Sequence, residues 1–215
     1  MIRTIIFDFD GVLCESVSIK TDAFYELYLP YGEDIAQKVK EHHMANGGMS
    51  RFDKFEYYEK TFLKKNTLSE ARMKTLSKDF SKLVMQKVIQ APFVKGAEDF
   101  LKNHSKAYQC FIVSATPMEE MLEIAKEKQI TPYFQEIFGS PKNKIEWCKY
   151  IIDTYHINVK ETLFIGDAQS DYKAAKFHGM HFLLRNTDEN KNIFTNTLNS
   201  INTLENLNLA IKSVI

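Results

Sequence analysis

Hydrophobic residues follow two different rhythms along the chain. Short apolar runs bounded by polar or turn residues are typical of buried strands. Such runs occur at 4–7, 108–113, 134–138, 162–165 and 180–184. From the second run onward they alternate with stretches in which apolar residues recur every three or four positions, as on one face of a helix. This alternation predicts an α/β fold, a doubly wound parallel sheet with helices on both faces.

The stretch 17–91 keeps the helical rhythm without any strand pattern. Four helices are predicted there, and capping or turn residues mark their ends: Pro30, Asn46-Gly47-Gly48, Ser50 and Ser69. About 75 residues is far more than the dozen or so that an ordinary crossover between parallel strands needs. We therefore expect an α/β core at 1–16 and 92–215, with a helical subdomain inserted at 17–91.

The core is expected to carry helices between its strands. These helices are predicted at 95–104, 117–128, 144–156, 170–178 and from about 204 onward. Pro117 is assigned to the first position of its helix, where a proline fits well, so that Ser114-Ala115-Thr116 forms a loop. The asparagine-rich tail after Arg185 is expected to be a surface loop before the last helix.

Polar side chains gather where the predicted strands end. They are Asp8 and Asp10 after the first strand, Ser114 and Thr116 after the second, and Asp167 with Asp171 after the fourth. In a doubly wound sheet, ligands bind at the carboxyl ends of the strands. Asp8 and Asp10 begin on the same side of a strand, and two like charges so close need a cation, a shared proton or water.

These side chains have a recognisable coordination chemistry. Several carboxylates form the hard-ligand set that suits Mg²⁺, which usually keeps several waters and takes one or two carboxylates together with a substrate phosphate. A hydroxyl group and a lysine from Pro141-Lys142-Asn143-Lys144 would add phosphate-binding groups. The residues alone therefore indicate a site for Mg²⁺ and a phosphate group.

Four segments, taken in order, resemble the motifs of the haloacid dehalogenase-like (HAD) hydrolases. They are Asp8-Phe9-Asp10-Gly11 for motif I, Ser114 for motif II, Lys144 or Lys142 for motif III, and Gly166-Asp167-Ala168-Gln169-Ser170-Asp171 for motif IV. The resemblance extends from Met1 to about Leu184. The inserted helices are similar to the C1 cap of that family, so the fold it implies is a HAD-like Rossmannoid core with a helical C1 cap.

The resemblance implies a role for each acidic residue. Asp8 would be the nucleophile that forms an aspartyl-phosphate, and Asp10 would protonate the leaving oxygen and later deprotonate water. Mg²⁺ would be held by Asp8, by the backbone carbonyl of Asp10 and by Asp167, with Asp171 acting directly or through water.

The resemblance also implies how the phosphoryl group is bound. Ser114 and the motif III lysine would bind its oxygens, helped by backbone N–H groups near Gly11 and Ala115. Two lysines compete for motif III. Lys142 aligns without gaps to members with a Lys-Pro segment, whereas Lys144 fits the Gly-Ser-Pro-x-x-Lys pattern of many members, and we favour Lys144.

The acid at position 10 narrows the expected reaction. True dehalogenases and phosphonatases of this family are expected to have a non-acidic residue there, so Asp10 favours phosphatase or phosphomutase chemistry. The main expectation is a Mg²⁺-dependent phosphatase that acts on a small phosphorylated metabolite, such as a sugar phosphate, phosphoglycolate or a nucleotide. The alternatives are a β-phosphomutase-like enzyme and a non-catalytic protein that binds a phosphorylated metabolite.

The segment from Asn46 to Arg51 has two interpretations. It looks like the cap loop that similar proteins lay over the active site, in which case Arg51 could bind an anionic group of the substrate. Alternatively, it is a helix C-cap followed by an N-cap, and Arg51 is solvated. His42 and His43 are interpreted as ordinary helix surface and core.

The composition restricts the expected partners and cellular location of the protein. Lys and Arg total 28, as do Asp and Glu, so the net charge is zero and gives no argument for binding nucleic acid or an anionic membrane. Cys14, Cys110 and Cys148 are widely spaced and are expected to be reduced thiols of a cytoplasmic protein, with Cys14 packed rather than reactive. No signal peptide or membrane-spanning run is recognised. The sequence makes no prediction of oligomeric state.

Overall fold

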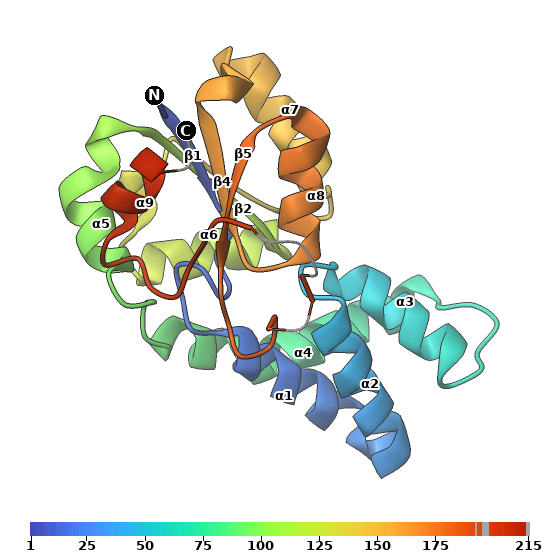
Figure 1. The fold of residues 1–215 in the computed structure, drawn as a ribbon. Helices are drawn as coiled ribbons and strands as arrows, with labels where there is room; N and C mark the ends of the chain where they lie inside the picture. The colour runs from blue at the N-terminus through green and yellow to red at the C-terminus, as the bar shows by residue number, and fades with distance from the viewer. Residues whose placement is uncertain (192, 195–197, 214–215) are drawn as a thin grey trace.

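A parallel sheet with β1 at its centre organises the molecule, as the computed structural model shows for residues 1–191, 193–194 and 198–213 (Figure 1). Its strands are β1 (Thr4–Phe7), β2 (Gln109–Pro117), β3 (Glu136–Ser140), β4 (Thr162–Gly166), β5 (His181–Arg185) and β6 (Ser200–Ile201). In the described residues their order is β3-β2-β1-β4-β5-β6, and all neighbouring pairs are parallel. The carboxyl end of β1 therefore lies between those of β2 and β4.

Helices cover both faces of this sheet (Figure 1). Those of the second part of the chain are α5 (Ala97–His104), α6 (Met118–Glu127), α7 (Lys144–Tyr155), α8 (Gln169–His178) and α9 (Leu207–Ser213). Alternate residues of β1 face opposite sides, as expected for a strand buried on both faces. Ile6 packs in one hydrophobic cluster with α7 and α8, whereas Ile5 and Phe7 pack in another with α5, α6 and α9.

The inserted helices lie beyond the carboxyl ends of the strands rather than on a face of the sheet (Figure 1). They are α1 (Val17–Tyr28), α2 (Glu33–Ala45), α3 (Arg51–Thr61) and α4 (Glu70–Gln90). An aromatic cluster joins three of them: the Phe24 ring of α1 lies 4.3 Å from the Phe80 ring of α4 and 5.8 Å from the Phe55 ring of α3, measured between centroids. We refer to α1–α4 as the cap; its boundaries at 17 and 91 stay a prediction.

The structure corrects the predicted start of α6. Ser114-Ala115-Thr116 is not a loop, because β2 continues through Pro117, which pairs with Ser140 of β3 after an irregularity in register. Pro117 is the N-cap of α6 rather than its first residue, since its ψ of 142° lies outside the helical range. Its missing N–H is tolerated here because it follows an irregularity of the strand pairing, a position at which sheets accept proline.

The C-terminal region also differs from its predicted form. The last helix starts at Leu207, three residues later than expected, and Leu204 packs in the core before it. The two-residue β6 was not predicted, because so short a strand leaves no periodic pattern. Part of the predicted surface loop, at 192 and 195–197, lies outside the described residues.

Two composition-based expectations can be compared with the structure. All three cysteines are buried and free, which confirms that they form no disulfide, and Cys14 is packed as expected. Among the helices of the described residues, none has both the length and the apolar character needed to cross a membrane.

The aromatic cluster makes a testable contribution to stability. Phe24→Ala is expected to lower the free energy of unfolding by about 3–5 kcal/mol, because it opens a cavity where α1, α3 and α4 meet. Phe177→Ala is the matched control: Phe177 is 70% exposed, so its removal should change stability by no more than about 0.5 kcal/mol. Urea unfolding measures both, and equal effects of the two substitutions would contradict the described packing.

Candidate active site

Asp8 follows β1 directly and is buried, with 4% of its surface exposed. Its Oδ1 atom accepts a 2.7 Å hydrogen bond from the backbone N–H of Phe9, and its Oδ2 atom lies 2.7 Å from Nζ of Lys144. The same Nζ atom donates to Oδ1 of Asp171 at 2.5 Å. Burial disfavours the lysine charge, but the two carboxylates outweigh it and raise the pKa of Lys144. A single buried cation therefore joins two buried carboxylates.

The structure distinguishes the two candidate lysines. Asn143 caps α7 through a capping box with Glu146, which makes Lys144 the first helical residue and places its side chain among the carboxylates. Lys142 is exposed, and its Nζ atom lies 4.5 Å from the centroid of the Trp147 ring. The lysine favoured from the sequence pattern, Lys144, is the one in contact with Asp8.

Asp171 fixes the turn between β4 and α8. Its Oδ2 atom accepts hydrogen bonds from the backbone N–H groups of Asp167 at 3.2 Å and Ala168 at 2.9 Å. Gly166 allows this close approach, since a Cβ atom there would lie 2.2 Å from Cβ of Asp171. Both carboxylate oxygens of Asp171 are thus engaged, one by the turn and the other by Lys144. Asp171 positions its neighbours even without a metal ion.

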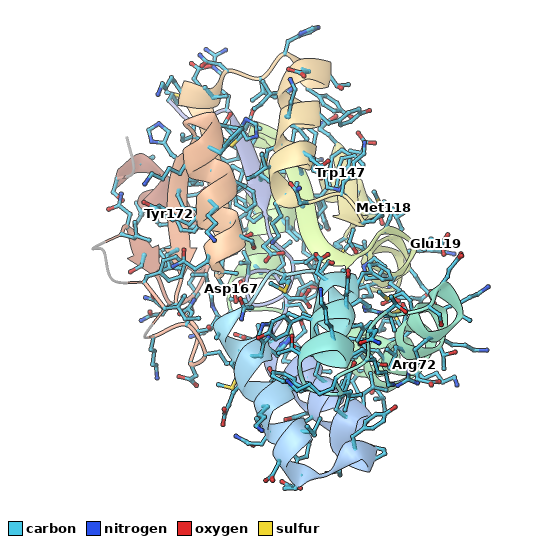
Figure 2. All side chains as sticks on the ribbon, turned by 90° about the vertical axis from the view of Figure 1, so that its right-hand side faces the viewer. Arg72, Met118, Glu119, Trp147, Asp167 and Tyr172 are labelled. Atoms are coloured by element: carbon cyan, nitrogen blue, oxygen red, sulfur yellow. The ribbon has the colours of Figure 1, made fainter. Side chains whose placement is uncertain are left out.

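Asp167 lies where the core meets the cap (Figure 2). Its carboxylate approaches the turn after β1 so closely that a Cβ atom at Gly11 would be 2.2 Å from its Oδ2 atom, and Gly11 also has a positive φ of 73°. Its backbone carbonyl accepts a 2.8 Å hydrogen bond from the buried side chain of Asn190. Asn190 was not predicted, because an asparagine-rich tail gives no sign of which amide is buried.

The cluster has more negative charge than its lysine can balance. Carboxylate oxygens of Asp8, Asp167 and Asp171 all lie within 4.8 Å of one another. Burial, together with the neighbouring carboxylates and against the effect of Lys144, raises the pKa of Asp8 to about 7, and the pKa of Asp167 is raised for the same reasons. These oxygen donors fit Mg²⁺, because a divalent cation would favour the ionised form of each carboxylate.

Asp10 lies in a different environment from Asp8. Its Oδ1 atom accepts a 2.6 Å hydrogen bond from Ser16, and its Oδ2 atom is bonded to Lys20 of α1 and, at 3.1 Å, to Thr116. Burial alone would raise the pKa of Asp10, but Lys20 and the two hydroxyl groups hold it below its usual value. Lys20 was missed from the sequence, since a lysine in the first turns of a helix is usually solvated.

Ser114 and Lys144 line one cavity, and Asp8, Asp10 and Asp167 line another. Ser114 is buried, and its Oγ atom accepts a 3.1 Å hydrogen bond from the N–H of Thr116. Both cavities are lined by the same residues on their common side: Gly47, Gly48, Met49 and Ala115. The glycine-rich loop between α2 and α3 therefore lies over the site, as its first interpretation required.

Arg51 is buried, and its guanidinium group is hydrogen-bonded. It is 5% exposed, and its guanidinium group donates two 2.7 Å hydrogen bonds to the carboxylate of Glu120 on α6 and one of 2.9 Å to Ser81. The interpretation of Arg51 as a solvated residue is therefore wrong, although Ser50 does cap α3. Arg51 lines the same cavity as Asp8, and its role as a substrate ligand stays a prediction.

Lys54 and His43 form a further polar pair that sequence reasoning missed. The Nζ atom of Lys54 lies 2.8 Å from Nδ1 of His43, both side chains are buried, and both line the cavity that contains Asp8 and Asp10. His43 was expected in the core, and it is buried there. Nothing in the sequence separates Lys54 from the other lysines of the cap, because burial of a lysine depends on its tertiary neighbours.

The fold and the residues at the ends of β1, β2 and β4 define a hydrolase of the HAD type. A family model described as haloacid dehalogenase-like hydrolase matches residues 5–184. The chain belongs to that family, which confirms both the resemblance and the expected α/β fold with its parallel sheet.

Several known proteins are similar to this chain. A phosphoglycolate phosphatase from Aliivibrio fischeri is 25% identical over 189 residues, which cover 84% of this chain and 82% of that protein. The structure of β-phosphoglucomutase from Clostridium difficile matches with a TM-score of 0.78 and 18% identity, over 99% of this chain and 98% of that chain. The HAD-hydrolase YfnB from Bacillus subtilis, bound to magnesium, matches with a TM-score of 0.73 and 20% identity, over 98% and 99% of the two chains.

The two candidate lysines should contribute differently to the free energy of unfolding. Lys144→Met is expected to lower the free energy of unfolding by about 3–5 kcal/mol in the absence of divalent cations, because it leaves two buried carboxylates without their counter-charge. Lys142→Met removes only an exposed contact with an aromatic ring and should cost less than about 1 kcal/mol. Urea unfolding near neutral pH measures both. A larger loss for Lys142→Met would contradict the described cluster.

Lys54 should give stability a distinct pH dependence. Burial, with a smaller contribution from Lys20, lowers its pKa from 10.5 to about 7. Between these values the unfolded chain binds a proton that the folded chain does not, so the free energy of unfolding rises with pH. The Lys54→Met variant lacks this proton, so its own stability does not gain from it. Its free energy of unfolding minus that of the wild type should therefore decrease from about pH 7.5 to about pH 10, by at most about 1.4 kcal/mol per pH unit. Parallel pH profiles of the two proteins in urea unfolding would refute this.

Proposed function

We propose that the protein is a Mg²⁺-dependent phosphatase that hydrolyses a small phosphomonoester through an aspartyl-phosphate on Asp8. The observation that carries this proposal is the buried carboxylate of Asp8, held by Lys144 at the end of the central strand with Asp167 beside it. The similar phosphoglycolate phosphatase from Aliivibrio fischeri supports the reaction class, and the magnesium-bound YfnB supports the metal.

In the first step, a carboxylate oxygen of Asp8 attacks phosphorus, and the bond between phosphorus and the ester oxygen breaks. Asp10 delivers its proton to the departing oxygen, which leaves as an alcohol. Lys144, the hydroxyl group of Ser114 and the backbone N–H of Ala115 bind the phosphoryl oxygens. When bound by Asp8, Asp167 and the backbone carbonyl of Asp10, Mg²⁺ would shield the anionic nucleophile from the anionic phosphate.

In the second step, water attacks the aspartyl-phosphate and regenerates Asp8 with release of inorganic phosphate. Asp10, now ionised, takes the proton from this water. The contacts of Asp10 with Lys20, Ser16 and Thr116 favour its ionised form and therefore suit this second step. Asp171 acts by holding Lys144 and the turn that carries Asp167.

The cap contributes by enclosing the site. The loop at 46–50 forms a wall of both cavities, so that a bound phosphoester would be separated from bulk water. A phosphomutase would use the same first step, and it would be recognised by conversion of a sugar phosphate to its isomer without net release of phosphate.

The nucleophile is tested by one isosteric change. Asp8→Asn is expected to lower phosphate release by at least about 1,000-fold, because it removes the attacking oxygen anion, while the folded state persists since one of several crowded negative charges is lost. Turnover is measured with Mg²⁺ on a broad panel of phosphomonoesters, and folding by circular dichroism. The matched control is Asp153→Asn, which changes an exposed aspartate on α7 and should leave turnover unaltered.

The outcomes discriminate between the hypotheses. Wild-type activity in the Asp8→Asn variant would exclude the aspartyl-phosphate route. Failure of the wild type to release phosphate from any ester of the panel, or to form an isomer, would instead favour the non-catalytic binding protein.

A further inference from the structure

The cavity beside Asp8 and Asp10 is lined by three cationic side chains of the cap. Two of them are matched by carboxylates of the core: Lys20 by Asp10, and Arg51 by Glu120. The third, Lys54, has no ion pair with any described residue. Its Nζ atom contacts Nδ1 of His43 at 2.8 Å and lies 5.4 Å from the centroid of the Phe24 ring.

This arrangement is costly for the protein alone. Lys54 is 2% exposed, and a buried ammonium group with no anionic partner loses its hydration without electrostatic compensation. Asp10 and Glu189 affect Lys54 only through space, and neither forms a hydrogen bond with it among the described residues. Lys20 repels it. An anion that enters the cavity would therefore favour the charged form of Lys54 and pair with it.

The position of Lys54 relative to the reacting carboxylates indicates which part of a ligand it meets. Lys144 and Ser114, two of the groups expected to bind the transferred phosphoryl group, line the neighbouring cavity, and Ala115 lines both. Lys54 lies on α3, in the cap, and shares its cavity with Asp10, the residue expected to protonate the leaving oxygen. A group that contacts Lys54 would belong to the leaving part of the substrate.

We propose that Lys54, oriented by His43, binds a second anionic group on the leaving part of the substrate, either a carboxylate or a second phosphate. This inference rests on the proposed phosphatase function and narrows its substrate class to small phosphoesters with two anionic ends. The cavity volume of about 80 Å³ supports a short leaving part, since it is smaller than an engineered cavity of about 150 Å³ that binds benzene. An uncharged end would leave Lys54 buried without a partner, so the site selects against it.

The test compares esters that differ only in the charge of the leaving part. Phosphoglycolate is paired with ethyl phosphate, and ethylene glycol bisphosphate with ethylene glycol monophosphate, so that the two pairs separate a carboxylate from a second phosphate. The ratio of kcat/KM within each pair is measured with Mg²⁺ for the wild type, Lys54→Met and Lys54→Gln. Lys60→Met is the matched control, because Lys60 is an exposed lysine on the same helix.

In at least one pair, the wild type is expected to prefer the ester whose leaving part carries an anionic group. The expected preference in kcat/KM is about 10- to 100-fold, the range typical of a buried charged hydrogen bond. Both Lys54 variants should lose most of this preference, whereas Lys60→Met should keep it. Preference by the wild type for neither ester, or full retention of the preference in both Lys54 variants, would overturn the proposal.

A binding measurement separates this proposal from the proposed reaction. In the Asp8→Asn background, phosphoglycolate should raise the midpoint of thermal unfolding more than ethyl phosphate does, or ethylene glycol bisphosphate more than the monophosphate, and Lys54→Met should abolish the difference. If this difference is present while the wild type hydrolyses no ester, the reaction is wrong and the anion subsite stands. If the wild type hydrolyses and binds the two esters equally in both pairs, the subsite is wrong and the reaction stands.

Discussion

The crowding of carboxylates around one lysine is the constraint on which the site depends. Asp8 and Asp167 follow two neighbouring strands and Asp171 lies in the first turn of α8, and their burial removes the water that would otherwise screen their repulsion. Lys144 offsets part of this repulsion by contacting two of the three. The remaining negative charge fits a divalent cation, as the proposed function requires, so the feature that costs stability is also the one on which the proposal rests.

Much of this site follows from the sequence because it depends on strands. β1 and β4 end within a residue of their predicted limits, which places Asp8 and Asp167 at one edge of the sheet, and Ser114 lies at the same edge although β2 continues to Pro117, beyond its predicted end at 113. The choice between Lys142 and Lys144 depended instead on where α7 begins. Sequence patterns alone allowed either lysine. The capping box of Asn143 makes Lys144 the first residue of α7 and so places it in the site.

The contacts between cap and core could not be predicted in the same way. Arg51 meets Glu120 across 69 residues of sequence, and Lys20 meets Thr116 across 96. No periodicity encodes such pairs, since they depend on how two separately packed units meet. The same holds for Lys54, whose burial is set by neighbours on α1 and α2. Selectivity is therefore the property least accessible from the sequence, whereas the reaction class is the most accessible.

The ion pair of Arg51 and Glu120 connects α3 of the cap with α6 of the core. Any movement that separates α3 from α6 would return both charges to water, and hydration would replace much of what the pair loses. Such a contact adds little to the strength with which the cap is held. Its planar geometry with two parallel hydrogen bonds is satisfied in only one alignment, however, so a cap that moved would regain the pair only in the described position. The pair therefore favours the alignment in which the loop at 46–50 lines both cavities around the reacting groups.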